Sequence, residues 1–398
     1  GSEFKPFKSI GKWSAEIVTQ SDPIVTLSST TDGSGDNAPQ NGSRIEGEDE
    51  CYIDFDINFN GSTGCAIVKI RYHNYTCEHD IFVREGYDPI DVAGKGTLWT
   101  SFNVDHFEKV GDKYKAVPTT SPIAEGSLFR RTSHVAILQS NNNLYPRCVR
   151  PAAEAKFAVH DPDSNTTEMT WSEIISKKKG DYNKWEILGD KENEHIAANT
   201  DVYGDQLISE SANDNSFPVA KSYGIVYADG ATETLTSVKE ATGYDGTNPA
   251  YGMMGVIVYN LNTCNQIFFP LGTEWHGHRK HGGGWRNNDT NGTLRYASRS
   301  EVWGHFTSDL GTLKTRPLVY DLYERPGAIY WLRDRVLSIP EIPIEGNSGT
   351  KYRDGTKSCA LDMNFYTMGF EGYMNDAASS NEGTDSHACF IRTVISSK

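Results

Sequence analysis

The chain has 398 residues and a formal net charge of −15, and 37% of its residues are hydrophobic and 11% aromatic. This content is ample for folded cores and argues against disorder, while the length favours two domains over one. The acidic balance argues against a nucleic-acid partner, because binding of phosphates needs clustered Lys and Arg.

No apolar run reaches the roughly 18 residues that a membrane-spanning helix needs. The longest run, residues 253–258, has the length of a strand. The opening Gly1-Ser2-Glu3-Phe4 (residues 1–4) looks like a cloning remnant, so we expect the native start to have been removed. The abundance of Gly, Asn, Thr, Ser and Tyr favours export. We therefore expect an extracellular protein without a membrane-spanning segment in this sequence.

The first part of the chain is rich in short segments with the alternation typical of strands. Residues 52–59 give the clearest signal, with one apolar and one polar face at a period of two. Asn60-Gly61 then predicts a tight turn, so that residues 66–72 return as the second strand of a hairpin. Residues 30–44 have the composition of a loop. Other strands are predicted at residues 13–19, 24–29, 81–87 and 134–138.

One helix is predicted at residues 170–177. Thr170 stands at its N-cap and Glu173 at the capping-box position three residues later. The polar stretch 189–217 is typical of a linker, and residues 223–230 then open a C-terminal domain. The early hairpin signals predict a β-sandwich-like N-terminal domain over residues 5–220, followed by a second domain over 221–398.

The seven Cys residues form an odd set without a C-x-x-C pair, which argues against a zinc ribbon or a thioredoxin-type site. Cys359 and Cys389 lie on predicted strands and could pair across a sheet. The alternative is that the Cys residues are buried and free, and act as small hydrophobic side chains.

Three segments of the last third are short apolar or aromatic strands interrupted by Gly, Pro or Asn, with an Arg close to an aromatic residue. They are residues 265–272, residues 277–279 together with 292–300, and residues 388–394. This pattern is typical of a loop-rich domain held by buried guanidinium groups. We therefore expect Arg295, Arg299 and Arg392 to donate hydrogen bonds to backbone carbonyls rather than to act on a substrate.

These segments resemble the FISUMP-type domain of Bacteroidetes surface proteins, in which LPAAGYR precedes YYWSS and a closing VRCV strand. The corresponding residues here are 269–272 through Arg279, then 295–298, and finally 390–394. The sequence departs from the pattern in two ways. Cys389 falls three positions before Arg392 instead of directly after it, and no Trp precedes Ser298.

Two further segments, residues 77–87 and 325–331, look like those of large exported Bacteroidales proteins associated with fimbriae as minor or tip components. The resemblance implies an α+β, β-rich chain whose second domain has a C-type-lectin-like or formylglycine-generating-enzyme-like mixed fold. It also implies an adhesive role at the cell surface, with other fimbrial subunits as partners. It supplies no ligand.

A ligand-binding site is predicted in the second domain, from flat apolar rings beside amides and a carboxylate. Sugars and peptide backbones are recognised by this combination. The candidate residues are Trp275, Trp285, Arg286, Asn287 and Asp289. The alternative is an ordinary Gly- and Asn-rich surface loop with one Trp folded inward.

The sequence contains no nucleophile, phosphate-binding or metalloprotease motif, so no enzyme activity is predicted. Glu274 with His276, His278 and His281 could bind zinc or copper, but their Gly-flanked spacing prearranges no face of an element, and no metal or cofactor is predicted. We expect a cell-surface or fimbrial tip adhesin that binds a host or bacterial glycan or protein. The alternatives are a structural minor pilus subunit without a ligand and an exported enzyme of formylglycine-generating-enzyme-like fold.

Overall fold

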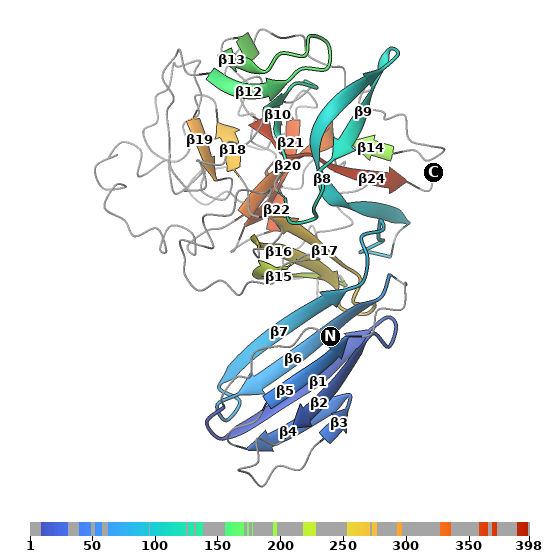
Figure 1. Ribbon diagram of the computed structural model, residues 1–398, viewed down its shortest axis with the longest axis vertical. Coiled ribbons are helices and arrows are strands. Elements are labelled where there is room, and N and C mark those ends of the chain that lie inside the picture. Colours follow the sequence, from blue (N-terminus) through green and yellow to red (C-terminus); the bar gives the residue numbers. More distant parts are fainter. Residues whose placement is uncertain are drawn as a thin grey trace, which may run out of the picture. The chain divides into compact units, whose positions relative to one another are not determined.

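The structure is a computed structural model of the chain (Figure 1). It describes residues 9–30, 40–48, 52–57, 63–94, 96–124, 126–130, 133–137, 156–170, 173–174, 177, 194–196, 218–227, 253–270, 273–276, 293–296, 327–335, 358–364, 368–371 and 388–396. The chain divides into two compact units. Unit 1 contains Gly1–Ile90 and Tyr259–Gln266, and unit 2 contains Asp91–Val258 and Ile267–Lys398.

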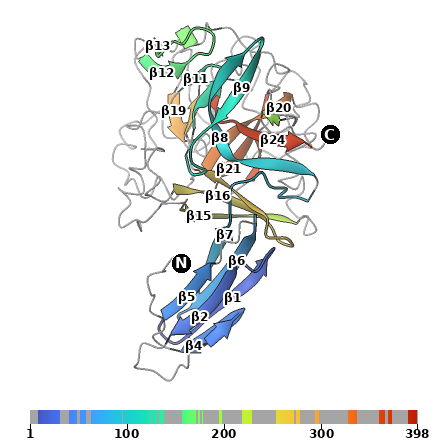
Figure 2. The same cartoon turned by 45° about the vertical axis from the view of Figure 1, so that its right-hand side comes forward.

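Unit 1 contains two antiparallel sheets, drawn in blue in Figures 1 and 2. The first has the order β4-β1-β6-β7, with β4 (Arg44–Glu48), β1 (Lys12–Gln20), β6 (Cys65–Tyr72) and β7 (Cys77–Arg84). The second has the order β3-β2-β5, with β3 (Gln40–Gly42), β2 (Val25–Thr30) and β5 (Tyr52–Ile57). The predicted strands at 13–19 and 24–29 are confirmed within one residue at each end, and the strand predicted at 81–87 is confirmed in part, because β7 includes residues 81–84.

The two sheets of unit 1 share one apolar core, as expected for a β-sandwich-like unit. Successive side chains of a strand point to opposite faces, so alternate residues reach this core. Trp13 and Ala15 of β1 lie in it with Leu27 of β2, and both Trp13 and Leu27 are fully buried. Other members are Ile24, Val25, Ile45, Ala66, Val68 and Ile70.

The predicted hairpin between residues 52–59 and 66–72 is wrong. Both segments are strands, but β5 pairs with β2, from Val25↔Ile57 to Thr30↔Tyr52, and β6 pairs with β1 and β7. The two strands therefore belong to different sheets. Periodicity identified each strand, but it does not specify the partner, and the Asn60-Gly61 signal was given too much weight. Part of the predicted loop 30–44 is also strand, namely β3 and the first residue of β4.

The largest sheet of unit 2 has seven strands in the order β13-β12-β11-β10-β23-β18-β19. Figure 2 shows β12 and β13 in green at one end. The strands are β10 (Leu128–Arg130), β11 (Ala136–Ile137), β12 (Lys156–His160), β13 (Glu168–Thr170), β18 (Thr273–His276), β19 (Thr293–Tyr296) and β23 (Ala388–Cys389).

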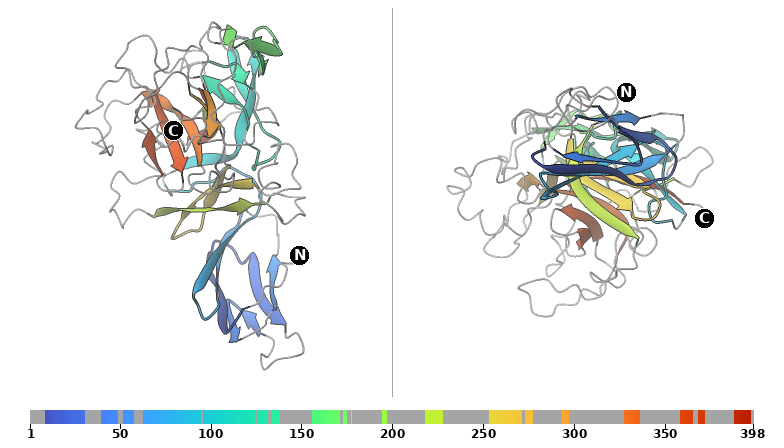
Figure 3. Two further views of the ribbon diagram at one scale, coloured as in Figure 1. Left: turned by 90° about the vertical axis from the view of Figure 1, so that its left-hand side faces the viewer. Right: turned by 90° about the horizontal axis from the view of Figure 1, so that it is seen from below.

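Three further sheets belong to unit 2, and Figure 3 shows the last of them in orange. The first contains β14 (Glu194–Ile196), β24 (Arg392–Ser396), β8 (Thr97–Val110) and β9 (Lys113–Pro118), in that order. The second contains β15 (Val219–Val226), β16 (Met253–Asn260) and β17 (Gln266–Pro270), although the ends of β16 and β17 at residues 259–260 and 266 fall in unit 1. The third contains β20 (Gly327–Arg335), β21 (Ser358–Asn364) and β22 (Met368–Glu371).

An aromatic cluster brings four distant parts of unit 2 together. Trp99 and Phe269 meet edge to face at 6.2 Å between ring centroids, Phe269 and Tyr330 at 5.1 Å, and Tyr330 and Phe390 lie 5.7 Å apart. Each ring is at most 2% exposed. Rings in these geometries contribute beyond the area they bury.

Strands make up 63% of the described residues and helix 1%, with Glu173 and Ile174 as the helical residues among them. The prediction of a β-rich chain is confirmed. The α+β assignment, with a C-type-lectin-like or formylglycine-generating-enzyme-like mixed domain at the C-terminus, is wrong. In the region where that domain was expected, the described residues pair as antiparallel strands. The expectation of a mixed fold came from the resemblance.

Two other expectations concern boundaries. The capping box of the predicted helix 170–177 is confirmed, because Glu173 N donates to Thr170 Oγ1 at 3.3 Å and Thr170 N donates to Glu173 Oε2 at 2.7 Å. The predicted domain boundary near residue 220 falls within unit 2, next to residues 197–217, which lie outside the described residues. That boundary stays a prediction.

Candidate functional site

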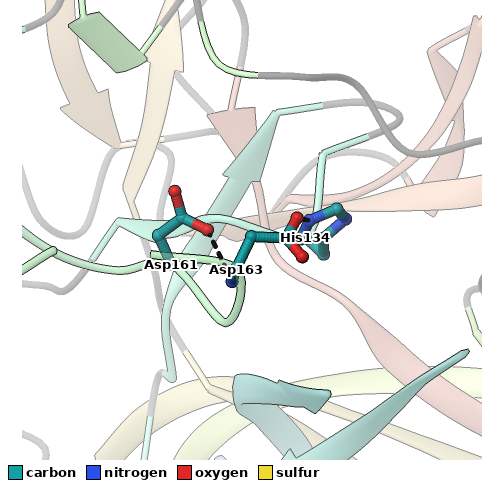
Figure 4. A group of neighbouring side chains, drawn as sticks. All are labelled: His134, Asp161 and Asp163. Atoms are coloured by element: carbon teal, nitrogen blue, oxygen red, sulfur yellow. Dashed lines mark hydrogen bonds and ion pairs between the residues drawn. The ribbon is translucent and has the colours of Figure 1, made fainter. Parts of the chain in front are cut away.

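In the described part of the chain, one group of His and acidic side chains is close enough to share a cation. It consists of His134, Asp161 and Asp163 and is called the acid–histidine cluster here (Figure 4). One possible ligand atom from each residue lies within 4.8 Å of the other two. His134 Nε2 and Asp163 Oδ2 are 2.8 Å apart.

Strand pairing in the seven-stranded sheet assembles this cluster. His134 comes just before β11 and Asp161 directly follows β12, and the register Ala136↔His160 places these two positions side by side. Asp163 lies in the turn between β12 and β13. Asp161 Oδ1 accepts a bond from the backbone N–H of Asp163 at 2.9 Å, which shapes the turn.

Asp163 is surrounded by donors. In addition to His134, Lys109 Nζ of β8 lies 2.8 Å from Oδ1, and the Tyr114 hydroxyl of β9 lies 3.0 Å from Oδ2. The Tyr114 ring stacks on the His134 ring with 3.8 Å between centroids and 19° between planes. The β8–β9 hairpin is thereby attached to the turn after β12.

Asp161 is also fully engaged by neighbours. Its Oδ2 accepts from Ser164 Oγ at 2.7 Å and lies 3.1 Å from Lys177 Nζ. Asp161 is 2% exposed, and a buried carboxylate of this kind must be paired to remain charged. Lys177 provides the opposite charge.

The protonation equilibria reflect these contacts. Burial of Asp163 tends to raise the pKa of its carboxyl, but the bonds from Lys109, His134 and Tyr114 prevail and hold the pKa well below its usual value. The pKa of Asp161 is lowered in the same way, since Ser164, the Asp163 amide and Lys177 outweigh burial. Burial first, and then the Asp163 carboxylate, raises the pKa of Tyr114 to about 12.

The acid–histidine cluster has the composition of a cation site but is already neutralised by the protein. Two ammonium groups lie within salt-bridge distance of its two carboxylates. A metal ion would have to displace these ammonium groups and the imidazole hydrogen bond. The ring of His134 is also only 5% exposed, which leaves a substrate little access to it. The geometry, with His134 and Asp161 buried and Asp163 exposed but paired, therefore fits a structural network better than a metal centre or a catalytic pair.

Sequence reasoning missed this cluster, although a signal for it was present. Asp161, Asp163 and Asn165 follow a D-x-D-x-N pattern, which marks a turn rich in side-chain-to-backbone bonds. Asn165 has φ of 51°, as such turns often require of an Asn. Lys109, Tyr114 and His134 are remote in sequence and carry no comparable signal.

The predicted ligand-binding residues are only partly described. Trp275 lies in β18, where its backbone is opposite Leu294 of β19 and Ala388 of β23. It is therefore on an interior strand of the seven-stranded sheet and not in a loop. Trp285, Arg286, Asn287 and Asp289 lie outside the described residues, as does Arg279.

Arg392 confirms the expected structural role of an arginine in the closing strand. Its Nε donates to Asn103 Oδ1 at 2.7 Å, Nη1 to Thr100 O at 3.1 Å and Nη2 to Phe268 O at 3.1 Å. The guanidinium carbon also lies 4.7 Å from the ring centroid of Phe269. With 1% exposure, Arg392 connects segments of unit 2 and is inaccessible to a ligand.

Three cysteine side chains are described, and none of them is bonded in a disulfide in the structure. Cys65 and Cys264 are buried, and Cys77 is half-buried. Cys359 and Cys389 lie in β21 and β23, which belong to different sheets, and pairing of the two stays a prediction.

No family model matches the chain, and no curated protein or solved structure matches it significantly. Within the residues that the structure describes, there is no helix with the length and apolar character to cross a bilayer.

Proposed function

We propose that this chain is a cell-surface adhesin of a fimbrial assembly, in which a β-scaffold presents binding side chains to a glycan or protein partner. The observation that carries the proposal is the β18–β19 pairing in unit 2. The two strands pair from Thr273↔Tyr296 to His276↔Thr293, so residues 277–292 connect two adjacent antiparallel strands. The candidate residues Trp285, Arg286, Asn287 and Asp289 all belong to this connection.

A connection of this kind suits binding because its two ends are fixed by a sheet. Binding residues concentrate on segments that a rigid scaffold positions. Trp275, one of the predicted binding residues, lies on β18 itself, opposite Leu294. The proposed site is therefore the sequence from Trp275 to Asp289, with aromatic rings for stacking and amides and a carboxylate for paired hydrogen bonds.

The buried polar groups of unit 2 favour binding over catalysis. Asp161 and Asp163 are neutralised by lysines, and Arg392 is bonded to backbone carbonyls and Asn103. Catalytic groups need access to a substrate, and their pKa values are shifted so that they can transfer a proton or attack in the reaction. Here the Asp163 carboxylate holds the β8–β9 hairpin to the turn after β12, and the Asp161 carboxylate bonds within that turn and to Lys177.

The test is binding of the purified chain to a glycan array and to whole bacterial and host cells. We expect a saturable ligand, and we expect Trp285→Ala to weaken its binding by about tenfold or more, which corresponds to about 1.4 kcal/mol. Arg44→Ala, on the exposed face of unit 1, is the matched control and should bind normally. Melting temperatures of both variants should equal that of the wild type.

The outcomes separate the alternatives. Binding that survives Trp285→Ala, Arg286→Ala and Asp289→Ala would place the ligand site elsewhere on the chain. Loss of stability in Trp285→Ala on the scale of a core truncation, about 3–5 kcal/mol, would mean that the ring is core. Absence of any ligand, together with incorporation of the chain into fimbriae, would support the structural pilus subunit instead.

A further inference from the structure

Two buried thiols of unit 1 come together from distant parts of the chain. Cys65 begins β6, and Cys264 lies in the turn between β16 and β17, within the segment Tyr259–Gln266 that belongs to unit 1. Both residues are 0% exposed. The Sγ atom of Cys264 donates a hydrogen bond to the carbonyl oxygen of Cys65 at 2.8 Å, across 199 positions of sequence.

This contact limits the distance between the two backbones. With standard bond lengths, a straight path from one Cα through this hydrogen bond to the other Cα spans about 9 Å at most, and each bond angle on the path shortens it. Disulfides join Cα atoms that are about 4.4–6.8 Å apart. The hydrogen bond therefore holds the two backbones near the range that a disulfide spans.

The segment that carries Cys264 is also bonded to β6 and β7. Gln266 Nε2 donates to Ala66 O at 3.4 Å and to Val83 O at 2.7 Å, and Arg84 Nη1 donates to Gln266 O at 3.2 Å. Burial raises the pKa of Cys65, while Arg84 and the amides of Gln266 lower it. Burial first, and then the Cys65 thiolate, raises the pKa of Cys264 to about 11.

The turn holds Cys264 in an unusual conformation. Its φ is 54°, in the left-handed region where residues with a Cβ are uncommon and carry an energetic cost. The backbone N–H of Cys264 donates to Asn260 O at 2.9 Å, and Asn260 Oδ1 accepts from the N–H of Asn262 at 2.8 Å. These bonds keep the thiol directed at Cys65.

We propose that Cys65 and Cys264 form a disulfide bond in the mature protein. The proposal rests on the proposed export of the chain, because the oxidant is a protein disulfide of the kind that oxidising extracytoplasmic compartments contain. One cysteine thiolate attacks the oxidant to give a mixed disulfide, and the second then attacks the bonded cysteine sulfur. The new S–S bond of the protein forms as the S–S bond of the oxidant breaks. The oxidant is thereby reduced to two thiols, which carry the two protons.

Burial determines when this exchange takes place. Only a thiolate is an effective nucleophile, and burial raises the pKa of both thiols in the folded unit. The bond therefore forms while unit 1 is folding and its thiols are still accessible. Once formed, it is shielded from reductants and attaches the Tyr259–Gln266 turn covalently to β6.

The test is refolding of the full chain in a buffer of reduced and oxidised glutathione, followed by alkylation under denaturing conditions and peptide mapping. Trypsin with an Asp-specific protease separates Cys65 from Cys51 and Cys77, because Asp54, Asp56, Lys69 and Arg71 lie between them. We expect a peptide pair that joins Cys65 to Cys264. Alkylation of both residues, or pairing of either with another cysteine, overturns the proposal.

Variants give a second measurement. Under the same conditions, reductant should lower the melting temperature of the wild type and of Cys77→Ser, the control with a half-buried free thiol. Reductant should not change the melting temperatures of Cys65→Ser and Cys264→Ser. The variant with both substitutions should melt no lower than the less stable of the two single variants. If a single variant fails to fold, the peptide map of the wild type still decides. If the Cys65–Cys264 disulfide forms but the chain binds no ligand, only the adhesin proposal is refuted. If the chain binds a ligand but the disulfide does not form, only the disulfide proposal is refuted.

Discussion

Replacement of Arg392 should destabilise unit 2 strongly, because this one side chain donates to three acceptors on two separate strands. Its partners are Asn103 and Thr100 of β8 and Phe268 of β17, at 2.7 to 3.1 Å. A hydrogen bond to a charged group has a net value of about 1.5–3 kcal/mol. We take the lower end, because the wild type also bears the cost of burying the guanidinium. Arg392→Ala should then lower the free energy of unfolding by about 4 kcal/mol, and the cavity adds to this loss.

Two further substitutions separate the causes of this loss. Arg392→Met keeps much of the apolar volume but removes every donor, so it should still cost about 3 kcal/mol. Arg392→Lys keeps the charge but has a single ammonium that cannot reach three divergent acceptors, and it should fall between the wild type and the Ala variant. The order of stability is therefore expected to be Arg, Lys, Met and Ala.

Urea unfolding followed by tryptophan fluorescence measures the effect in the right unit. Trp13 is the one tryptophan in unit 1, and the other seven of the 8 belong to unit 2. Arg44→Ala is the control, since its guanidinium is exposed and pairs with Glu16 and Glu46 in unit 1, and its unfolding midpoint should not change. An Arg392→Met variant within about 1 kcal/mol of the wild type would refute the reasoning, as when a buried charge is replaced by a well-packed apolar group.

Two other predictions test unit 2. Because the folded pKa of Asp163 lies below its unfolded value, this carboxylate contributes stability that is present above about pH 4 and is lost as the pH falls further. Asp163→Asn should therefore flatten the decline in the urea midpoint from pH 5 to pH 3, whereas the exposed Asp22→Asn should keep the wild-type slope, and equal slopes would contradict this role. Gly255→Ala should cost about 1–3 kcal/mol, because a Cβ there would overlap Phe269 O and lie 2.6 Å from the Phe268 ring. Gly224→Ala, whose Cβ would be 3.8 Å from Ile257 Cδ1, should stay within about 0.5 kcal/mol, and a similar loss in both variants would count against the close approach.

The sequence predicted individual strands well, because a half-buried strand leaves a period of two in its own residues. β1, β2 and β5 were identified in this way, β16 was marked by an apolar run of strand length, and the capping box at Thr170 and Glu173 is also a local pattern. Pairing could not be predicted as well. β5 was assigned to β6 through the Asn60-Gly61 turn, while its partner is β2, because periodicity fixes the faces of a strand but not its neighbour.

The candidate site was harder to predict for the same reason. Asp161 and Asp163 stand in a recognisable turn, but Lys109, Tyr114 and His134 reach them only through the pairing of β8 with β9 and of β11 with β12. A sequence shows charged residues and cannot show which of them are neutralised. Glu274 and the neighbouring histidines suggested a metal site because they are close together in the sequence. The acid–histidine cluster is assembled by long-range contacts, which the sequence does not show.

The prediction for Arg392 succeeded because it depended on chemistry and not on position. An arginine among Phe390, Ile391 and Val394 in a closing strand has to bury its guanidinium or leave the strand, since its neighbours are core residues. A buried guanidinium with several donors needs several acceptors, and here two strand carbonyls and the Asn103 side chain supply them. Its role as a structural anchor followed from the sequence, but its partners, between 124 and 292 positions away, did not. Local residues thus determine what a side chain must find, and the topology determines where it finds it.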